Sequence, residues 1–220
     1  MSRTDRWRSV GDEAGQGSRW AGPLPRGFGV RLAFIAEQHR DAFKTVRERS
    51  RSLHAPWEVI RSEDPAGDSA FDNQLADANT ARSQRMLVFE EKGDEILGQV
   101  NLSLPSPAPP GSAYAGYWSS SDCVGRGVAT RALALALDHA FNHLTLHRVE
   151  VSIQPNNAPS LAAVRRLGFT EEGLARKLLR IAGVWRDHLR FSMLEEEWPE
   201  KRAAAAPRLE AYRRTVGDAS

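Results

Sequence analysis

Residues 115–130 read AGYWSSSDCVGRGVAT, a strand, a glycine turn and the start of a helix in succession. It joins a strand that ends at Trp118 to a helix that begins near Arg126, through a turn that holds Gly125 and Gly127. Glycine lets the backbone approach a ligand closely. The first turn of a helix offers unpaired N–H groups at the positive end of the helix dipole. The stretch therefore predicts a phosphate or pyrophosphate site on residues 124–130.

Two nucleotide-binding motifs that also use a glycine turn do not match. Walker A requires Gly-x-x-x-x-Gly-Lys-Ser/Thr, and the sequence contains no such run. The dinucleotide fingerprint Gly-x-Gly-x-x-Gly/Ala fails at its third position, which is Thr130. That fingerprint also belongs after the first strand of a parallel unit, whereas this turn follows four expected strands. A protein that binds ATP or NAD is therefore disfavoured.

Hydrophobic periodicity outside the turn predicts alternating strands and helices. The expected strands are 29–35, 86–91, 96–104, 113–119, 148–153, 174–181 and 184–194. The expected helices are 36–49, 71–85 with Asp68 as a cap, 126–144 and 158–167, and residues 52–57 are expected to form a loop. This order predicts an α/β (α+β) fold, a mixed sheet with helices on its faces.

The composition is that of an ordinary globular protein, with 41% hydrophobic and 26% charged residues among 220. We expect a mobile N-terminal tail over 1–26, one domain over 27–198 and a charged C-terminal tail over 199–220, either helical or disordered. A net charge of +2 gives no footprint for direct nucleic-acid binding. No apolar stretch reaches the roughly 18 residues of a membrane span. The polar N-terminus does not resemble a secretory signal, so a cytoplasmic protein is expected.

Cys123 is the only cysteine, so an internal disulfide is excluded. Paired Cys/His ligand spacing is also absent from the sequence, which argues against a metal site. A nucleophilic cysteine would need a partner base, and we interpret Cys123 as a packing residue.

Motifs downstream of the turn narrow the choice among phosphate-containing ligands. Asn157-Ala158-Pro159-Ser160 is followed by Leu167-Gly168-Phe169 and then by Glu172-Gly173. Together with the Gly-Tyr-Trp strand end and the glycine turn, this ordered set resembles the GNAT acetyltransferase superfamily and its RimJ/RimL-like branch, over residues 28–198. The resemblance implies a mostly antiparallel sheet of about seven strands flanked by about four helices. It also implies direct transfer of an acetyl group from acetyl-CoA to an amine in a ternary complex, without a metal.

The resemblance also implies which residues hold acetyl-CoA. Backbone N–H groups of the turn would bind the pyrophosphate, the backbone at the end of the 113–119 strand would pair with the pantetheine arm, and an asparagine would contact that arm. The donor residues are then Trp118, Ser119, Val124, Gly125, Arg126, Gly127, Val128, Ala129, Thr130 and Asn157. One departure is Val124, which replaces the Gln or Arg of the family; backbone donors make this tolerable.

Acyl transfer requires protonation of the leaving thiolate. By resemblance, Ser160 is the candidate proton donor, and its alternative role is to satisfy the first turn of a helix. The tyrosine that many GNAT enzymes use would fall at Val164, so this chain cannot use it.

The general base is less defined. Positions where family members place a glutamate are occupied by Leu179 and Ser152. Glu150 shares a strand face with Ser152 and is the fallback base, with an ordinary sheet carboxylate as the alternative. Glu172 and His188 are further options. A free α-amine has a pKa near 8, so about a tenth of it is neutral at pH 7 and water can take the proton.

The acceptor is implied by resemblance alone to be the N-terminal α-amine of a protein, of the ribosomal-protein type. His54 and Trp57 lie in the loop that borders the acceptor groove in the family, and they are substrate-side candidates, with local packing as the alternative. Two other functions stay open: acetylation of a small-molecule amine such as an amino acid, polyamine or antibiotic, and a non-catalytic acyl-CoA-binding module. The sequence does not determine the oligomeric state, and a homodimer stays open.

Overall fold

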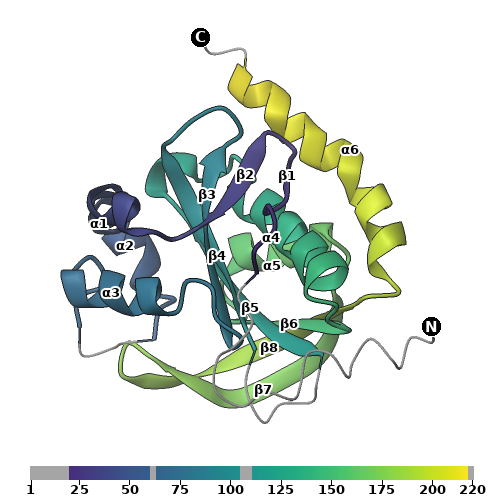
Figure 1. The fold of residues 1–220 in the computed structure, drawn as a ribbon. Helices are drawn as coiled ribbons and strands as arrows, with labels where there is room; N and C mark the ends of the chain where they lie inside the picture. The colour runs from purple at the N-terminus through teal and green to yellow at the C-terminus, as the bar shows by residue number, and fades with distance from the viewer. Residues whose placement is uncertain (1–19, 60–62, 105–110, 218–220) are drawn as a thin grey trace.

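The computed structural model describes residues 20–59, 63–104 and 111–217, which form one sheet with helices on both faces (Figure 1). The eight strands of the sheet pair in the order β1-β2-β3-β4-β5-β6-β8-β7. All neighbours are antiparallel except β5 and β6. The strands are β1 (Arg26–Gly27), β2 (Val30–Phe34), β3 (Ser83–Glu90), β4 (Ile96–Ser103), β5 (Ser112–Ser119), β6 (Arg148–Ile153), β7 (Thr170–Ile181) and β8 (Val184–Leu194).

Six α-helices occur in the described ranges. They are α1 (Arg40–Arg49), α2 (Arg51–His54), α3 (Asp68–Ala76), α4 (Val128–Asp138), α5 (Ala158–Arg166) and α6 (Trp198–Gly217). Short 3-10 turns lie at Glu37–His39 and Ser121–Cys123, and a π-helical turn lies at His139–His143. None of the described helices is long and apolar enough to cross a bilayer.

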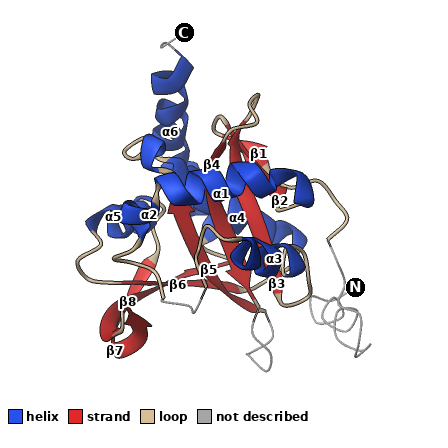
Figure 2. Cartoon of the chain, turned by 90° about the vertical axis from the view of Figure 1, so that its left-hand side faces the viewer, coloured by secondary structure: helices blue, strands red, loops and turns tan. Residues whose placement is uncertain are grey.

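Strand β3 shows why the sheet is covered on both sides. Its residues Met86 to Phe89 are all apolar and at most 2% exposed. Met86 and Val88 belong to the core cluster under α4 and α5, whereas Leu87 and Phe89 belong to the cluster under α1 and α3. Because successive side chains of a strand point to opposite faces, a continuous apolar run requires two covering layers. Figures 1 and 2 show α1 and α3 on one face and α4 on the other.

Strands β5 and β6 are parallel, and α4 makes the crossover between them. They pair only where Ser112–Tyr114 lies beside Arg148–Glu150. Beyond this point β5 stays with β4 as far as Ser119, and β6 stays with β8 as far as Ile153. The two strands therefore part, and each presents a free backbone edge to the opening between them.

Most expected elements are present, and the main error concerns the helix expected over 71–85. Helix α3 ends at Ala76, and Ser83 already belongs to β3. The turn between them is held by polar side chains: Gln84 Nε2 donates to Asn79 Oδ1 over 2.9 Å, and the Arg82 N–H donates to Thr80 Oγ1 over 3.2 Å. Such side chains compete with helical hydrogen bonds and stop a helix.

Smaller differences concern the bounds of other elements. The helix expected over 126–144 is α4, which begins at Val128 and passes into the π-helical turn after Asp138. Strand β7 begins at Thr170, four residues before the expected start, and part of the expected loop 52–57 is the short helix α2. Strand β1 has only two residues, too few for a periodic signal, and it raises the expected seven strands to eight.

The C-terminal residues expected as a charged tail form α6, which packs on the core. Ala205 and Leu209 are 4% and 1% exposed. Figure 1 shows α6 along the same side of the molecule as α4. Of the expected N-terminal tail, residues 1–19 lie outside the described part of the chain. Within the remainder, the ring of Trp20 stacks on His143 with 4.6 Å between centroids.

Candidate active site

The opening between β5 and β6 offers two backbone edges to an extended ligand. On the β5 side the edge without a neighbouring strand runs from Ala115 to Ser119, where the Ser119 carbonyl already accepts from His54, and on the β6 side it runs from Val151 to Ile153. Backbone N–H and C=O groups are strong hydrogen-bonding groups that need partners. An extended molecule with amide groups, such as a pantetheine arm, can pair with such an edge as an added strand would.

The glycine turn lies at the end of α4 that faces this opening. Gly125 and Gly127 have φ values of +79° and +67°, a conformation that residues with a Cβ rarely adopt. Gly127 is the N-cap of α4 and makes no side-chain cap, so the N–H groups of the first helical turn keep their capacity to bind an anion. Val128 and Thr130 are 1% and 2% exposed, so they would serve a ligand only through the main chain.

Arg131 fixes the shape of the turn, and sequence reasoning missed it. Its Nη2 donates to the carbonyl of Arg126 over 3.1 Å, and its Nη1 donates to the carbonyl of Phe28 over 3.0 Å. The side chain is buried, and burial, assisted by the nearby Arg126, lowers the pKa of Arg131. Arg126 itself pairs with Glu90 over 3.0 Å. The sequence could have pointed to Arg131, because its i+4 spacing from Gly127 places it one helical turn after the N-cap.

Asn157 and Ser160 begin α5 at the open end of β6. The Asn157 carboxamide oxygen accepts the N–H of Ser160 over 3.2 Å, so Asn157 caps the helix. The side-chain NH2 group of Asn157 is then left to donate to a ligand. The half-buried Tyr117 reaches from β5 to the same place, where its hydroxyl donates to the carbonyl of Ser160 over 3.3 Å. Burial raises the pKa of Tyr117 to about 12, which keeps this hydroxyl protonated.

Glu150 lies at the paired end of the two strands, opposite Tyr114. It is 8% exposed, and each of its carboxylate oxygens is engaged by an arginine: Arg148 Nε donates to one over 3.0 Å, and Arg190 Nη2 donates to the other. Arg148 also pairs with Glu172, and this bond holds the pKa of Glu172 below its usual value. The carboxylate of Glu150 is therefore part of an ion-pair network.

His54 connects the α2 segment to the end of β5. Its Nε2 donates to the Ser119 carbonyl over 2.9 Å, and its Nδ1 accepts from Arg47 over 2.7 Å. Burial is the main cause that lowers the pKa of His54, and it favours the neutral ring that this bonding pattern requires. Arg47 also pairs with Glu58 and lies 5.0 Å from the centroid of the Trp118 ring. Arg47 and Glu58 carried no sequence signal beyond their charge.

The segment after His54 borders the open end of β6, where Gln154 follows the strand. The Gln154 side chain donates to the Pro56 carbonyl over 3.2 Å, and Val59 forms a bridge with Ile181 at the tip of the β7–β8 hairpin. Trp57 lies partly buried between these two fixed points. Leu179 is 38% exposed on the hairpin, whereas His188 is 3% exposed and binds the carbonyl of Arg186. Three of the candidate residues, Glu150, Glu172 and His188, are held in the sheet, and the other candidates lie around the opening.

Cys123 is 3% exposed next to the turn, and burial raises the pKa of its thiol. A thiol that resists ionisation is a poor nucleophile, which agrees with a packing role.

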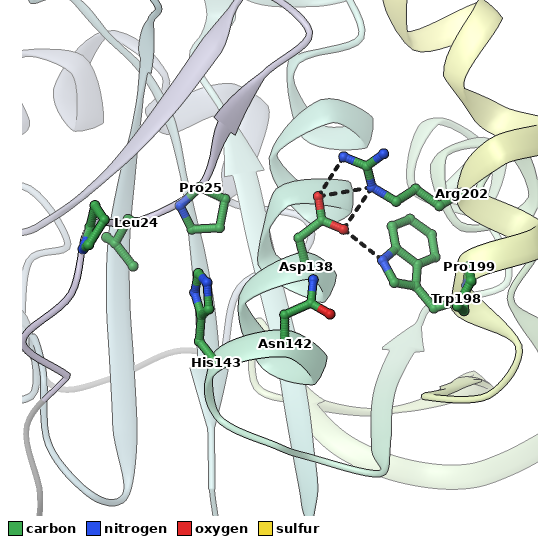
Figure 3. A pocket seen from close by; sticks show the side chains of 9 residues that line it. Leu24, Pro25, Asp138, Asn142, His143, Trp198, Pro199 and Arg202 are labelled. Carbon is green, nitrogen blue, oxygen red and sulfur yellow. Dashed lines mark hydrogen bonds and ion pairs between the residues drawn. The ribbon is translucent and has the colours of Figure 1, made fainter.

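A pocket of about 480 Å³ occurs elsewhere, between the N-terminal segment, the π-helical turn and the start of α6 (Figure 3). Its carboxylate, Asp138, already accepts from Arg202 and from the indole N–H of Trp198. The described part of the chain also holds no group of three or more His, Cys, Asp or Glu placed to bind a metal ion. The opening between β5 and β6 is therefore the better candidate for the active site.

Comparison with known proteins agrees with this geometry. The family model described as an acetyltransferase (GNAT) domain matches residues 30–170. Alignment with the Bacillus subtilis protein YjcK is 34% identical over 110 residues, 50% of this chain and 61% of that protein. Alignment with the ribosomal protein uS5-alanine N-acetyltransferase of Escherichia coli is 28% identical and covers 76% of this chain and 90% of that enzyme.

Among solved structures, Mycobacterium smegmatis RimJ in complex with CoA-disulfide superimposes with a TM-score of 0.74. It is 32% identical, and the match covers 87% of this chain and 94% of that one. The chain therefore belongs to the GNAT acetyltransferase family, in its RimJ/RimL-like branch.

Proposed function

We propose that this acetyltransferase modifies the N-terminal α-amine of a protein, of the ribosomal-protein type, by direct transfer from acetyl-CoA. Acetyl-CoA as co-substrate agrees with the CoA complex of the similar RimJ structure. The observation that carries the donor site is the opening between β5 and β6 next to the uncapped start of α4. The acceptor is supported by the similarity to the uS5-alanine enzyme, which extends over most of both chains.

The donor site works largely through the main chain. The N–H groups of residues 124–130 hold the pyrophosphate, and the free edge of β5 at Trp118 and Ser119 pairs with the pantetheine arm. The arm then leads the thioester toward the start of α5, where the Asn157 amide contacts it. The acceptor enters from the side of His54 and Trp57, because the donor occupies the opposite side of the opening.

Direct transfer is supported by the environment of Cys123. An acyl-enzyme would need an exposed, ionised thiolate, and this thiol is buried with a raised pKa. In the direct step, the amine nitrogen attacks the thioester carbon, the carbon–sulfur bond breaks, and CoA leaves as a thiolate.

Ser160 is the proposed proton donor to that thiolate. It lies in the first turn of α5, where the helix dipole stabilises negative charge while the proton moves. Among the described residues its hydroxyl makes no hydrogen bond, so it is available to the ligand. The amine proton leaves to water, since Glu150 is already engaged by two arginines, and water returns a proton to the Ser160 oxygen.

A thiol-release assay on the full chain tests the acceptor. Peptides that begin with alanine are compared with spermidine, an aminoglycoside and free amino acids, and a peptide with a blocked N-terminus controls for lysine acetylation. We expect kcat/KM to be highest for the free N-terminal peptides. A higher value for any small amine would overturn the protein acceptor and leave the donor site intact.

A further inference from the structure

Helix α6 is fixed at its start by Asp138, and its residue Tyr212 lies against the glycine turn. Trp198 Nε1 donates to Asp138 over 2.8 Å, and Arg202 pairs with the same carboxylate. Asp138 is the last residue of α4, whereas Tyr212, in the second half of α6, lies at Gly127, the N-cap of α4. The two helices therefore run in opposite directions, and the buried Leu209 fixes α6 between these points.

The half-buried Tyr212 lies directly against Gly127. A Cβ placed on Gly127 would come within 2.6, 2.6 and 2.7 Å of the ring carbons Cδ2, Cε2 and Cδ1 of Tyr212. Three ring carbons at nearly equal distance mean that the ring covers the glycine. Gly127 is thus required by its neighbour as well as by its positive φ.

The other half of the turn is open. A Cβ on Gly125 would meet nothing within 4 Å, and the neighbouring Val124 is 60% exposed. The turn therefore has a covered end at Gly127 and an exposed end at Gly125. A ligand can reach its N–H groups from the exposed end, with the ring of Tyr212 as a boundary.

We propose that Tyr212 is an acetyl-CoA-binding residue whose ring packs against the nucleotide end of the co-substrate. The inference rests on the proposed donor site. With the pantetheine arm along β5, the adenosine must extend from the pyrophosphate in another direction, past the turn and the end of α6. A tyrosine ring offers a flat apolar face to a base or ribose, and the anchored helix holds that face in place.

The test compares two donors that differ only in the nucleotide end. S-acetylpantetheine keeps the thioester and the arm but lacks the phosphates and adenosine. We expect Tyr212→Ala to lower kcat/KM for acetyl-CoA about tenfold, through KM, by loss of the stacking contact. Activity with S-acetylpantetheine should not change. Tyr212→Phe should keep near wild-type KM, because the ring carries the contact. Arg208→Ala, an exposed position on the same helix, is the matched control.

Thermal unfolding of each variant checks the fold. An equal loss with both donors would show that Tyr212 only supports the turn and would overturn the proposal, as would an unchanged KM. Tighter binding of acetyl-CoA by Tyr212→Ala would identify the ring as an obstruction and overturn it as well. Gly125→Glu distinguishes a failure of the Tyr212 proposal from a failure of the donor site. If Gly125→Glu no longer binds acetyl-CoA while Tyr212→Ala binds it normally, only the Tyr212 proposal fails. If both bind normally, the donor site fails too.

Discussion

The two sides of the opening are built from different kinds of group. On the proposed donor side the groups offered to the ligand are backbone N–H and C=O groups of the turn and of β5, with glycines that make them accessible. On the proposed acceptor side they are side chains of the segment that holds His54 and Trp57, which lies far from the turn in the sequence. His54 joins the sides, because it donates to the carbonyl of Ser119.

This difference explains what each side reveals. A backbone site needs particular residue types at fixed spacing, so it leaves a motif. A side-chain site can be built by many combinations, and its specificity changes with a few substitutions. The donor is therefore common to a family, whereas the acceptor belongs to the individual enzyme.

The largest expected effect comes from a charge on the donor turn. Gly125→Glu forces a side chain onto a φ of +79° and places a carboxylate where the phosphates bind. We expect acetyl-CoA affinity to fall by more than about a hundredfold, as several phosphate contacts are lost together. Isothermal titration calorimetry with acetyl-CoA measures this.

Gly183→Glu is the matched control for backbone strain. Gly183 has the same φ of +79° and equally open space around its Cβ position, but it lies at the tip of the β7–β8 hairpin. It should bind acetyl-CoA like the wild type. Gly127→Glu is a poorer probe, since it also collides with Tyr212. Equal affinities for Gly125→Glu and Gly183→Glu would remove the turn from the donor site.

The same difference determines how much could be predicted from the sequence. Strands 148–153 and 184–194 were predicted with the bounds that the structure has, because their alternation is local. The turn was found because it needs glycine. The contact between the ring of Tyr212 and Gly127 was not predicted, because the two residues lie 85 positions apart and α6 shows only weak hydrophobic periodicity. Likewise, nothing local to Glu150 showed that Arg190 on β8 would engage it.

Ser160→Ala is expected to have the next largest effect. Loss of a proton donor typically costs about a hundredfold or more in kcat, whereas the cap through Asn157 uses the backbone N–H of Ser160 and persists. Steady-state kcat should therefore fall while acetyl-CoA affinity stays within about twofold. Ser152→Ala on β6 is the control. An unchanged kcat would assign Ser160 to the helix alone.

The bond between the two sides predicts a pH effect. The pKa of His54 is lowered mainly by burial, so the neutral ring dominates in the folded state at neutral pH. As pH falls below 6.5, the ordinary pKa of histidine, a proton on Nδ1 would face Arg47, which donates to it. Stability from the neutral ring is present above pH 6.5 and is lost as pH falls through the lowered pKa. We expect KM for the amine to rise about tenfold through this range, the cost of an unpaired buried donor.

His54→Gln separates this effect from protonation of the substrate amine. Glutamine keeps a donor for the Ser119 carbonyl but does not titrate. At pH 7 its kinetics should stay close to wild type, and in acid its KM should rise only as far as amine protonation requires. Acetyl-CoA affinity should be constant in both proteins. Identical pH profiles for both would show that His54 does not link the two sides.

The smallest expected effect is that of Glu150→Gln. Its two oxygens accept from Arg148 and Arg190, and glutamine keeps an acceptor oxygen for one of them and loses the bond to the other. Arg148 keeps Glu172 as a second partner, so the rest of the network survives. We expect kcat to change by less than about threefold, the size of a lost partly exposed ion pair, and the pH–rate profile to keep its shape. Glu172→Gln, in the same network, should behave alike. If Glu150→Gln alone lost more than about a hundredfold together with the acidic limb of the profile, Glu150 would be the general base. The acceptor side would then contain a catalytic side chain, and its difference from the donor side would be one of chemistry as well as of construction.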